Sequence, residues 1–201
     1  MTSVKMDPQL SIKTARLIAF FPIFQQGFSV PIQKKQTILD FLCETNGLNP
    51  KVVYRQIQTL FLTGKAVDEM SGTLIKPGDT LALSAALPGL AGATMRSGGL
   101  LAGFRCAITH REGPAPSTLA KGLLTVKLFN QVIKALGPSF LKQGVLITVE
   151  QVRELLRGLA AEDWSDCSGL EINGQPVDPR DWSWPDWPQG RGVVRLQVLF
   201  E

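Results

Sequence analysis

Short apolar runs separated by polar turns fill the first half of the chain. The run over residues 17–32 is rich in Phe, Ile and Val and predicts two strands joined by a turn at Gly27. The apolar spacing over residues 37–44 is typical of a short helix. Residues 52–62 and 80–85 are β-rich and predict further strands, with glycine-containing turns between them. This half is therefore expected to mix several strands with one helix.

The second half repeats this alternation. Residues 123–129 and 193–200 are apolar runs with partial alternation and predict strands. Residues 130–136 predict a short helix, and residues 144–149 predict another strand. In residues 150–159, Val and Leu recur at the i, i+3, i+4, i+7 spacing of an amphipathic helix. The two halves thus share an order of elements.

A short motif also recurs in the two halves. It reads Gly64-Lys65-Ala66-Val67-Asp68 in the first half and Gly174-Gln175-Pro176-Val177-Asp178 in the second. Each copy follows a predicted strand and precedes a loop and a final strand. A period this long indicates duplicated domains rather than a solenoid. The alternative is that a short turn pattern has recurred by chance.

The segment around the first copy carries a family resemblance. It reads Thr59-Leu60-Phe61-Leu62-Thr63-Gly64-Lys65-Ala66-Val67-Asp68, followed by Ile75-Lys76-Pro77-Gly78-Asp79-Thr80-Leu81-Ala82-Leu83. This order of strand, Gly turn, Val-Asp, loop, Gly-Asp and strand resembles the β-grasp or ubiquitin-like fold. The sulfur carriers share the layout, among them the small subunit of molybdopterin synthase and the thiamine sulfur carrier. Residues 170–178 look like the same segment.

The resemblance implies an α+β protein with two β-grasp domains in tandem. The first would span residues 1–86 and the second residues 119–201, with an ordered Gly/Pro-rich connector over residues 87–118. Ubiquitin and the sulfur carriers end in a free Gly-Gly tail whose small residues enter a narrow active site. This chain ends Val198-Leu199-Phe200-Glu201. The second half therefore departs from a conventional carrier.

The connector is unusual because it is rich in glycine yet apolar. Residues 87–105 contain no acidic residue, whereas a mobile linker is ordinarily polar. Three interpretations remain open. The segment is an ordered connector packed on the domains, or a binding loop whose backbone amides and Arg96, Arg105 and Arg111 hold an anion or a partner. In the third, the chain is cut after Gly99 to release a carrier-like Gly98-Gly99 tail.

Composition narrows the function classes. Hydrophobic residues make up 44% and charged residues 19%, which suits a packed core, and the net charge of +4 is too mild to indicate nucleic-acid binding. Three scattered cysteines without a CxxC pair, with a single histidine, predict neither a metal site nor a disulfide framework. A reducing, cytoplasmic location is expected. The polar N-terminal residues predict no signal peptide, and the apolar run 81–95 is too short for a membrane span.

Two further groups of residues are candidates for chemistry. Cys106 and His110 are four residues apart and share a face in a helix or in a strand, so a thiolate–imidazole pair is possible; a buried Cys with a surface His is the alternative. All four tryptophans lie near the C-terminus. Trp182, Trp184 and Trp187 form either a recognition surface or a cap on a small core. Acidic neighbours make this cluster a poor platform for nucleic-acid bases.

Together these features predict a non-catalytic binding or scaffold protein with a protein partner and with no nucleic acid, membrane, cofactor or metal. The resemblance implies a link to molybdenum or tungsten cofactor or sulfur-transfer pathways. The alternative is a sulfur-carrier precursor processed after Gly99, or an enzyme that uses Cys106. No catalytic residue is assigned. The candidate binding residues are Gly89, Gly92, Arg96, Gly98, Gly99, Arg105, Trp182, Trp184 and Trp187.

Overall fold

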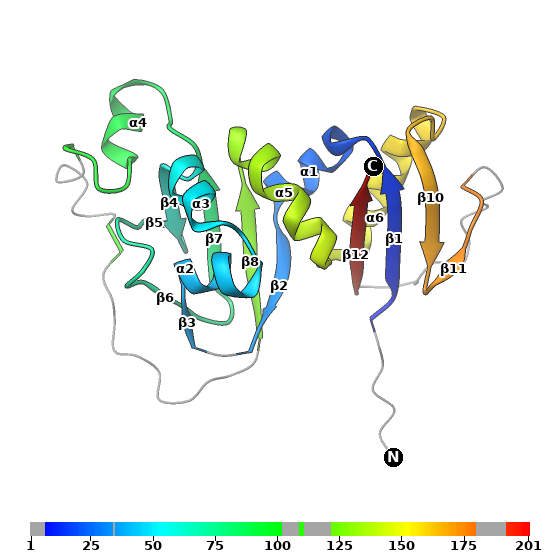
Figure 1. Cartoon of the computed structure of the whole chain (residues 1–201), viewed down its shortest axis with the longest axis horizontal. Coiled ribbons are helices and arrows are strands. Elements are labelled where there is room, and N and C mark those ends of the chain that lie inside the picture. Colours follow the sequence, from blue (N-terminus) through cyan, green and yellow to red (C-terminus); the bar gives the residue numbers. More distant parts are fainter. Residues whose placement is uncertain (1–6, 34, 102–108, 111–121, 180–191) are drawn as a thin grey trace, which may run out of the picture. The chain divides into compact units, whose positions relative to one another are not determined.

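The computed structural model is an α+β protein with parallel and antiparallel strand pairs (Figure 1). It describes residues 7–33, 35–101, 109–110, 122–179 and 192–201. The chain forms two compact units: unit 1 combines Met1–Ile23 with Phe140–Glu201, and unit 2 is Phe24–Ser139. The expected division at residues 1–86, 87–118 and 119–201 follows chain order, whereas unit 1 contains both ends of the chain.

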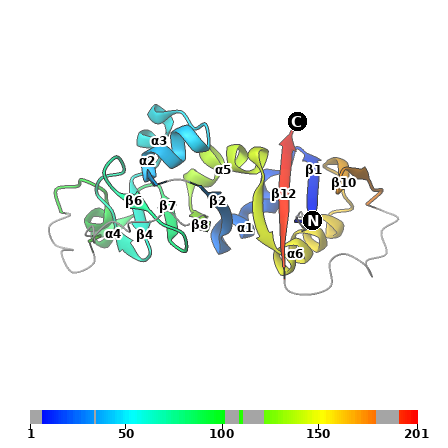
Figure 2. The same cartoon turned by 90° about the horizontal axis from the view of Figure 1, so that it is seen from below.

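Unit 2 contains a five-stranded sheet with the strand order β2, β8, β7, β4, β5. Strand β8 runs antiparallel to β2 and parallel to β7, and the remaining neighbours are antiparallel. The helices α2 and α3 lie over one face of this sheet (Figure 2). The strands are β2 (Phe28–Ile32), β4 (Thr59–Leu62), β5 (Lys65–Ala66), β7 (Thr80–Ser84) and β8 (Gly122–Leu128).

Unit 1 contains a second five-stranded sheet with the order β9, β12, β1, β10, β11. Strands β1 and β12 are parallel, and all other neighbours are antiparallel. The long helix α6 (Val149–Ala161) lies over one face of it (Figure 1). The strands are β1 (Gln9–Thr14), β9 (Val145–Thr148), β10 (Cys167–Ile172), β11 (Gln175–Pro176) and β12 (Val193–Phe200).

The other elements are short. Two small strands, β3 and β6, form a separate ribbon in unit 2. The boundary between the units falls inside α1 and inside α5, so the chain passes between them twice through helices. The elements are η1 (Leu17–Phe20), α1 (Phe21–Gln26), β3 (Gln36–Thr37), α2 (Ile38–Asp40), η2 (Phe41–Thr45), α3 (Pro50–Gln56), β6 (Leu74–Ile75), α4 (Gly89–Met95) and α5 (Gln131–Gln143).

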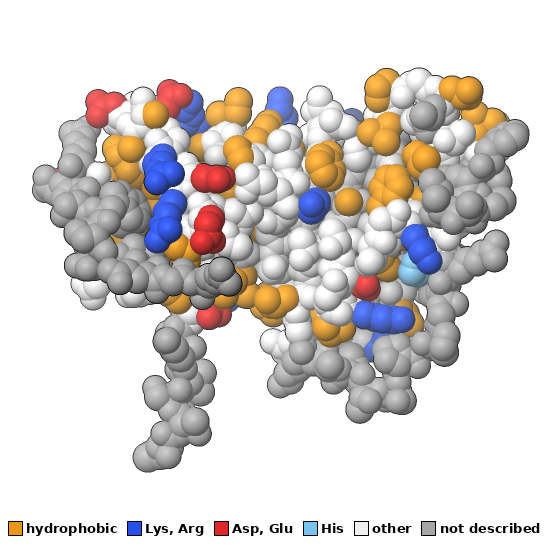
Figure 3. Space-filling model, turned by 180° about the vertical axis from the view of Figure 1, so that it is seen from behind, with side chains coloured by type: hydrophobic (Ala, Val, Ile, Leu, Met, Phe, Trp, Pro, Cys, Tyr) orange, Lys and Arg blue, Asp and Glu red, His pale blue; other side chains and the backbone are white. Residues whose placement is uncertain are grey.

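The core of each unit follows from alternation along its central strands. In β8, Leu124, Val126 and Leu128 are fully buried, while the residues between them are at least partly exposed. In unit 1 the helix α6 buries one stripe of Val and Leu. Its opposite face alternates basic and acidic side chains (Figure 3), which is typical of a solvent-exposed helix. The residues on that face are Glu150, Arg153, Glu154 and Arg157.

The two sheets have the same sequence of strand directions and the same local devices. In each unit a strand leads into a helix through a threonine capping box: the ribbon strand β3 through Thr37 with Asp40, and β9 through Thr148 with Gln151. In each capping box the threonine hydroxyl accepts a hydrogen bond from a backbone amide. Asp40 N donates to Thr37 Oγ1 at 3.1 Å, and Gln151 N donates to Thr148 Oγ1 at 3.2 Å.

The repeated sequence motifs form equivalent hairpins. Both residues of each turn have a positive φ, as a two-residue hairpin turn requires; the turns are Thr63-Gly64 and Asn173-Gly174. Beyond each turn, a valine amide bonds back across the hairpin, Val67 N to Leu60 O and Val177 N to Leu170 O, each at 2.9 Å. The recurrence of the motif therefore has a structural counterpart.

Several sequence predictions are confirmed and others are wrong. The strands expected over residues 80–85, 123–129, 144–149 and 193–200 are present, as is the helix over residues 150–159. The prediction of a first strand within residues 17–32 is wrong, because η1 and α1 occupy residues 17–26. Pro22 lies in the first turn of α1, where the backbone N–H that proline lacks would have no partner within the helix.

Two more corrections concern helices. Residues 50–56 form helix α3 rather than the start of a strand, because the Asn49 side chain accepts a bond from Lys51 N at 2.9 Å and Pro50 opens the helix. The helix expected to close at Gly137-Pro138 continues to Gln143. Strand β1 was not expected at all. Across the described ranges, no helix combines the length and apolar character needed to cross a bilayer.

Candidate functional site

Five of the predicted binding residues lie together in unit 2, directly after β7. Gly89 and Gly92 belong to α4, and Arg96, Gly98 and Gly99 follow it. The other four, Arg105, Trp182, Trp184 and Trp187, lie outside the described residues, as do Cys106 and Arg111. The structure therefore addresses only the first part of the predicted contact surface.

Helix α4 packs closely against the segment that leads into it. Gly89 has a positive φ of 77°, which lets the chain turn sharply into the helix. Gly92 is buried and faces Leu87, and a Cβ on Gly92 would collide with the Leu87 carbonyl oxygen and lie 2.8 Å from its Cβ. Only glycine at position 92 permits this approach, which places α4 over residues 86–87.

The turn after α4 is held to the β4–β5 hairpin by hydrogen bonds. Ser97 donates its amide to Gln58 O at 2.9 Å and its hydroxyl to Val67 O at 2.7 Å. Gly98 donates its amide to the Asp68 carboxylate at 2.9 Å. The Gly99 amide bonds to Arg96 O at 3.1 Å. These amides are engaged within the protein, so they do not form a set of donors for an anion.

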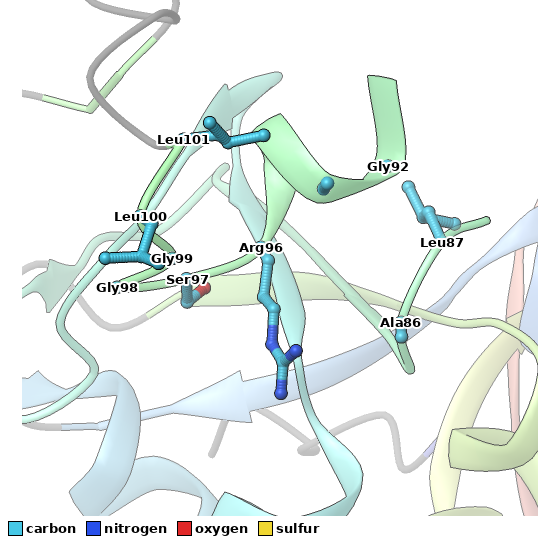
Figure 4. A pocket seen from close by; sticks show the side chains of 10 residues that line it. Ala86, Leu87, Gly92, Arg96, Ser97, Gly98, Gly99, Leu100 and Leu101 are labelled. Atoms are coloured by element: carbon cyan, nitrogen blue, oxygen red, sulfur yellow. The ribbon is translucent and has the colours of Figure 1, made fainter. Parts of the chain in front are cut away.

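The packing of α4 and this turn creates a hollow that we call the α4 groove. Its volume is about 590 Å³. In Figure 4, Leu87 lies to one side and Leu100 and Leu101 to the other, and the Arg96 side chain extends away from the helix. The lining consists of Ala86, Leu87, Gly92, Ala93, Arg96, Ser97, Gly98, Gly99, Leu100 and Leu101. The groove is thus mostly apolar, with one charged side chain.

Two leucines of this region are strongly exposed. Leu90 on α4 has 75% of its side chain accessible, and Leu100 in the groove lining is fully accessible. Single exposed leucines are normal on protein surfaces. Two within one short segment, beside an apolar hollow and on a hydrogen-bonded scaffold, are typical of a contact surface.

The exposed edge of β5 is also partly occupied. Thr109 forms a parallel bridge with Ala66, and the His110 amide donates to Ala66 O at 2.7 Å. His110 is half-buried rather than on the open surface. Because Cys106 lies outside the described residues, the expected pairing of Cys106 with His110 stays a prediction.

Comparison with family models, with curated proteins and with solved structures finds no match. The chemistry of the site therefore rests on its own residues. In the part of the chain that the structure describes, no group of His, Cys, Asp and Glu side chains is placed to hold a metal ion.

The two described cysteines are not activated thiols. Burial raises the pKa of Cys43 and of Cys167, which keeps both thiols neutral near pH 7. Cys167 begins strand β10 and is half-buried. It lines a second hollow of about 460 Å³ in unit 1, next to the buried Trp164.

The sequence predicts a binding role neither for the leucines that line the α4 groove, Leu87, Leu100 and Leu101, nor for the exposed Leu90. The predicted residues in this segment are glycines and arginines, because those types carry recognisable turn and charge chemistry. Leucine in an apolar run is typical of a core residue. Only the tertiary packing shows that Leu90 and Leu100 face outward.

Proposed function

We propose that this protein is a non-catalytic binding module that recognises a protein partner through the α4 groove. The observation that carries the proposal is the exposure of Leu90 and Leu100 beside an apolar hollow. The hydrogen bonds from Ser97 and Gly98 to the β4–β5 hairpin hold this surface in place before a partner arrives. A pre-organised surface loses little conformational entropy on binding.

We also propose that each unit is a β-grasp domain. The proposal is supported by the strand directions, since each sheet has two parallel central strands flanked by antiparallel ones. It is also supported by the capped helix that lies between the first strand and the hairpin in each unit, and by the equivalent hairpins. A link to molybdenum or tungsten cofactor or sulfur-transfer pathways stays a prediction from the resemblance alone, since fold does not imply function.

The processed-carrier alternative has less support from the described contacts. A cut after Gly99 would leave β8 on the other fragment, and β8 is the strand that joins β2 to β7. The Gly98 amide is bonded to Asp68 rather than extended as a tail. For an enzyme that uses Cys106, the test is loss of activity in a folded Cys106→Ala protein.

The binding proposal predicts that the exposed leucines are needed for partner capture. Burying two leucines contributes roughly 1.5–3 kcal/mol each, so the Leu90→Glu, Leu100→Glu double variant is expected to weaken binding at least about 100-fold. Tagged wild-type protein is used to capture partners from its native cells, and the affinity of the recovered partner is then measured. Charge reversal at Arg96 and Arg105 should weaken the same interaction.

The matched control is Ile18→Glu, which places the same charge on a 61% exposed residue of unit 1. It should bind like the wild type. A captured partner that binds the double leucine variant with unchanged affinity would remove the α4 groove as the contact surface.

A further inference from the structure

Each compact unit takes one central strand from the opposite half of the chain. Unit 1 consists mostly of residues after position 140, yet β1 comes from the beginning of the chain. Unit 2 consists mostly of residues before position 90, yet β8 follows the long Gly/Pro-rich connector. Both borrowed strands lie inside their sheets rather than at an edge.

The borrowed strands make continuous pairings. Strand β1 pairs in parallel with β12 from Gln9 opposite Arg195 to Thr14 opposite Phe200, and its other side pairs with β10. Leu10 and Ile12 of β1 are almost completely buried. Without β1, strand β10 has no partner linking it to β12, and the centre of the unit 1 sheet is interrupted.

Strand β8 has the same position in unit 2. It pairs with β2 from Phe28 opposite Val126 to Ile32 opposite Gly122, and with β7 from Thr80 opposite Thr125. The side chains that it contributes to the core, Leu124, Val126 and Leu128, are fully buried. Removing β8 separates β2 from the rest of the sheet.

The strand pairing shows which strand of each half joins the sheet of the other half. In the first half of the chain, β1 precedes β2, β3, the helix α2 and the β4–β5 hairpin; in the second half, β8 precedes β9, the helix α6 and the β10–β11 hairpin. Yet β1 completes the sheet of the second half and β8 completes the sheet of the first. The two borrowed strands are not in equivalent places, because β1 lies between β12 and β10, where unit 2 has β7, whereas β8 lies between β2 and β7. We infer that the two halves of the chain are interlocked by these borrowed strands, so that neither half can complete its own sheet. The two halves therefore depend on each other to fold. After a cut in the connector between them, the two fragments stay associated.

This inference rests on the strand pairing and is independent of the proposed binding function. It is tested by inserting a specific protease recognition sequence between Gly113 and Ser117 and cutting the folded protein. The two fragments are expected to elute together on size exclusion, with unchanged circular dichroism, and to separate only in denaturant. Fragments that separate under native conditions, each keeping its secondary structure, would overturn the interlocking.

A second measurement does not depend on the inserted sequence. Ser11 and Gln197 are opposite each other in the parallel β1–β12 pair. Neighbouring strands lie about 4.8 Å apart, which is within the Cα spacing that a disulfide spans. The double variant Ser11→Cys, Gln197→Cys should form a crosslink on mild oxidation, seen as a shift on a non-reducing gel. Thr80→Cys with Thr125→Cys tests the β7–β8 pair in the same way.

The single variants Ser11→Cys and Thr80→Cys are the controls and should give no shift. If the double variants behave like the singles, the pairing of the borrowed strands is wrong. Partner capture through the α4 groove is measured separately, so the binding proposal and the interlocking can fail independently.

Discussion

The Val126→Asp protein is expected to be largely unfolded or insoluble, whereas Lys127→Asp folds like the wild type. Val126 is fully buried and pairs with Phe28 on one side and Leu81 on the other, both also buried. Burying an unpaired carboxylate costs several kcal/mol, which is comparable with a total stability of about 5–15 kcal/mol. Lys127 is the next residue of β8 and faces away from the core.

Urea unfolding followed by circular dichroism measures this difference. The Lys127→Asp midpoint should lie close to that of the wild type, since surface substitutions change stability by about 0.5 kcal/mol or less. If both variants unfold at similar urea concentrations, β8 is not a central strand of unit 2. Because β8 follows the connector in sequence, the result also tests the composition of that unit.

Two glycine-to-alanine changes in helices are expected to act in opposite directions. Gly137 lies in α5, where an added Cβ would be 2.7 Å from the Phe24 ring. That ring is fully buried and packs edge-on against Phe28, with centroids 5.9 Å apart, so it has no space to move. Overpacking costs about 1–3 kcal/mol, which exceeds the gain of about 1 kcal/mol in helix propensity. Gly137→Ala should therefore destabilise the protein.

Gly158 provides the matched change. It lies in α6 with nothing within 4 Å of the added Cβ, and it is exposed. Only the propensity gain applies there, so Gly158→Ala should stabilise the protein by up to about 1 kcal/mol. Thermal unfolding of the two variants beside the wild type measures both signs. A stabilising Gly137→Ala would mean that the Phe24 ring does not pack against α5 as described.

Local signals predicted most of the second half. The strand at residues 193–200 and the helix at residues 150–159 carry strong apolar periodicity, and both are present. The Gly64 and Gly174 motifs predicted turns for a specific reason: a two-residue hairpin needs positive φ, which glycine adopts without strain.

The failures occurred where local signals competed. Residues 52–56 contain valine and tyrosine, which favour strands, but the Asn49 cap and Pro50 begin a helix there. Proline within an apolar run is also compatible with an edge strand, but Pro22 lies in the first turn of α1. In each case the proline is compatible both with a strand and with the first turn of a helix. The conformation of the neighbouring backbone decides which of the two forms.

The candidate site shows the same division. Residues 87–105 stand out by composition, and Gly89 and Gly92 are among the binding residues that the sequence predicts. The close approach of Gly92 to Leu87, the hydrogen bonds that hold Ser97 and Gly98 to residues 58–68, and the exposure of Leu90 and Leu100 are tertiary features. Contacts with distant residues produce no periodic pattern of hydrophobic residues within the segment, so the sequence does not predict them.

By itself, the sequence determined the α+β character, the duplicated hairpins and the apolar, glycine-rich connector, because each depends on residues close together in the chain. The tertiary structure alone decided which strands pair. Strand β1 is a short segment whose own residues do not indicate which sheet it joins. Its place depends on pairing across more than a hundred residues, as between Leu10 and Leu196, and no local pattern encodes such a partner.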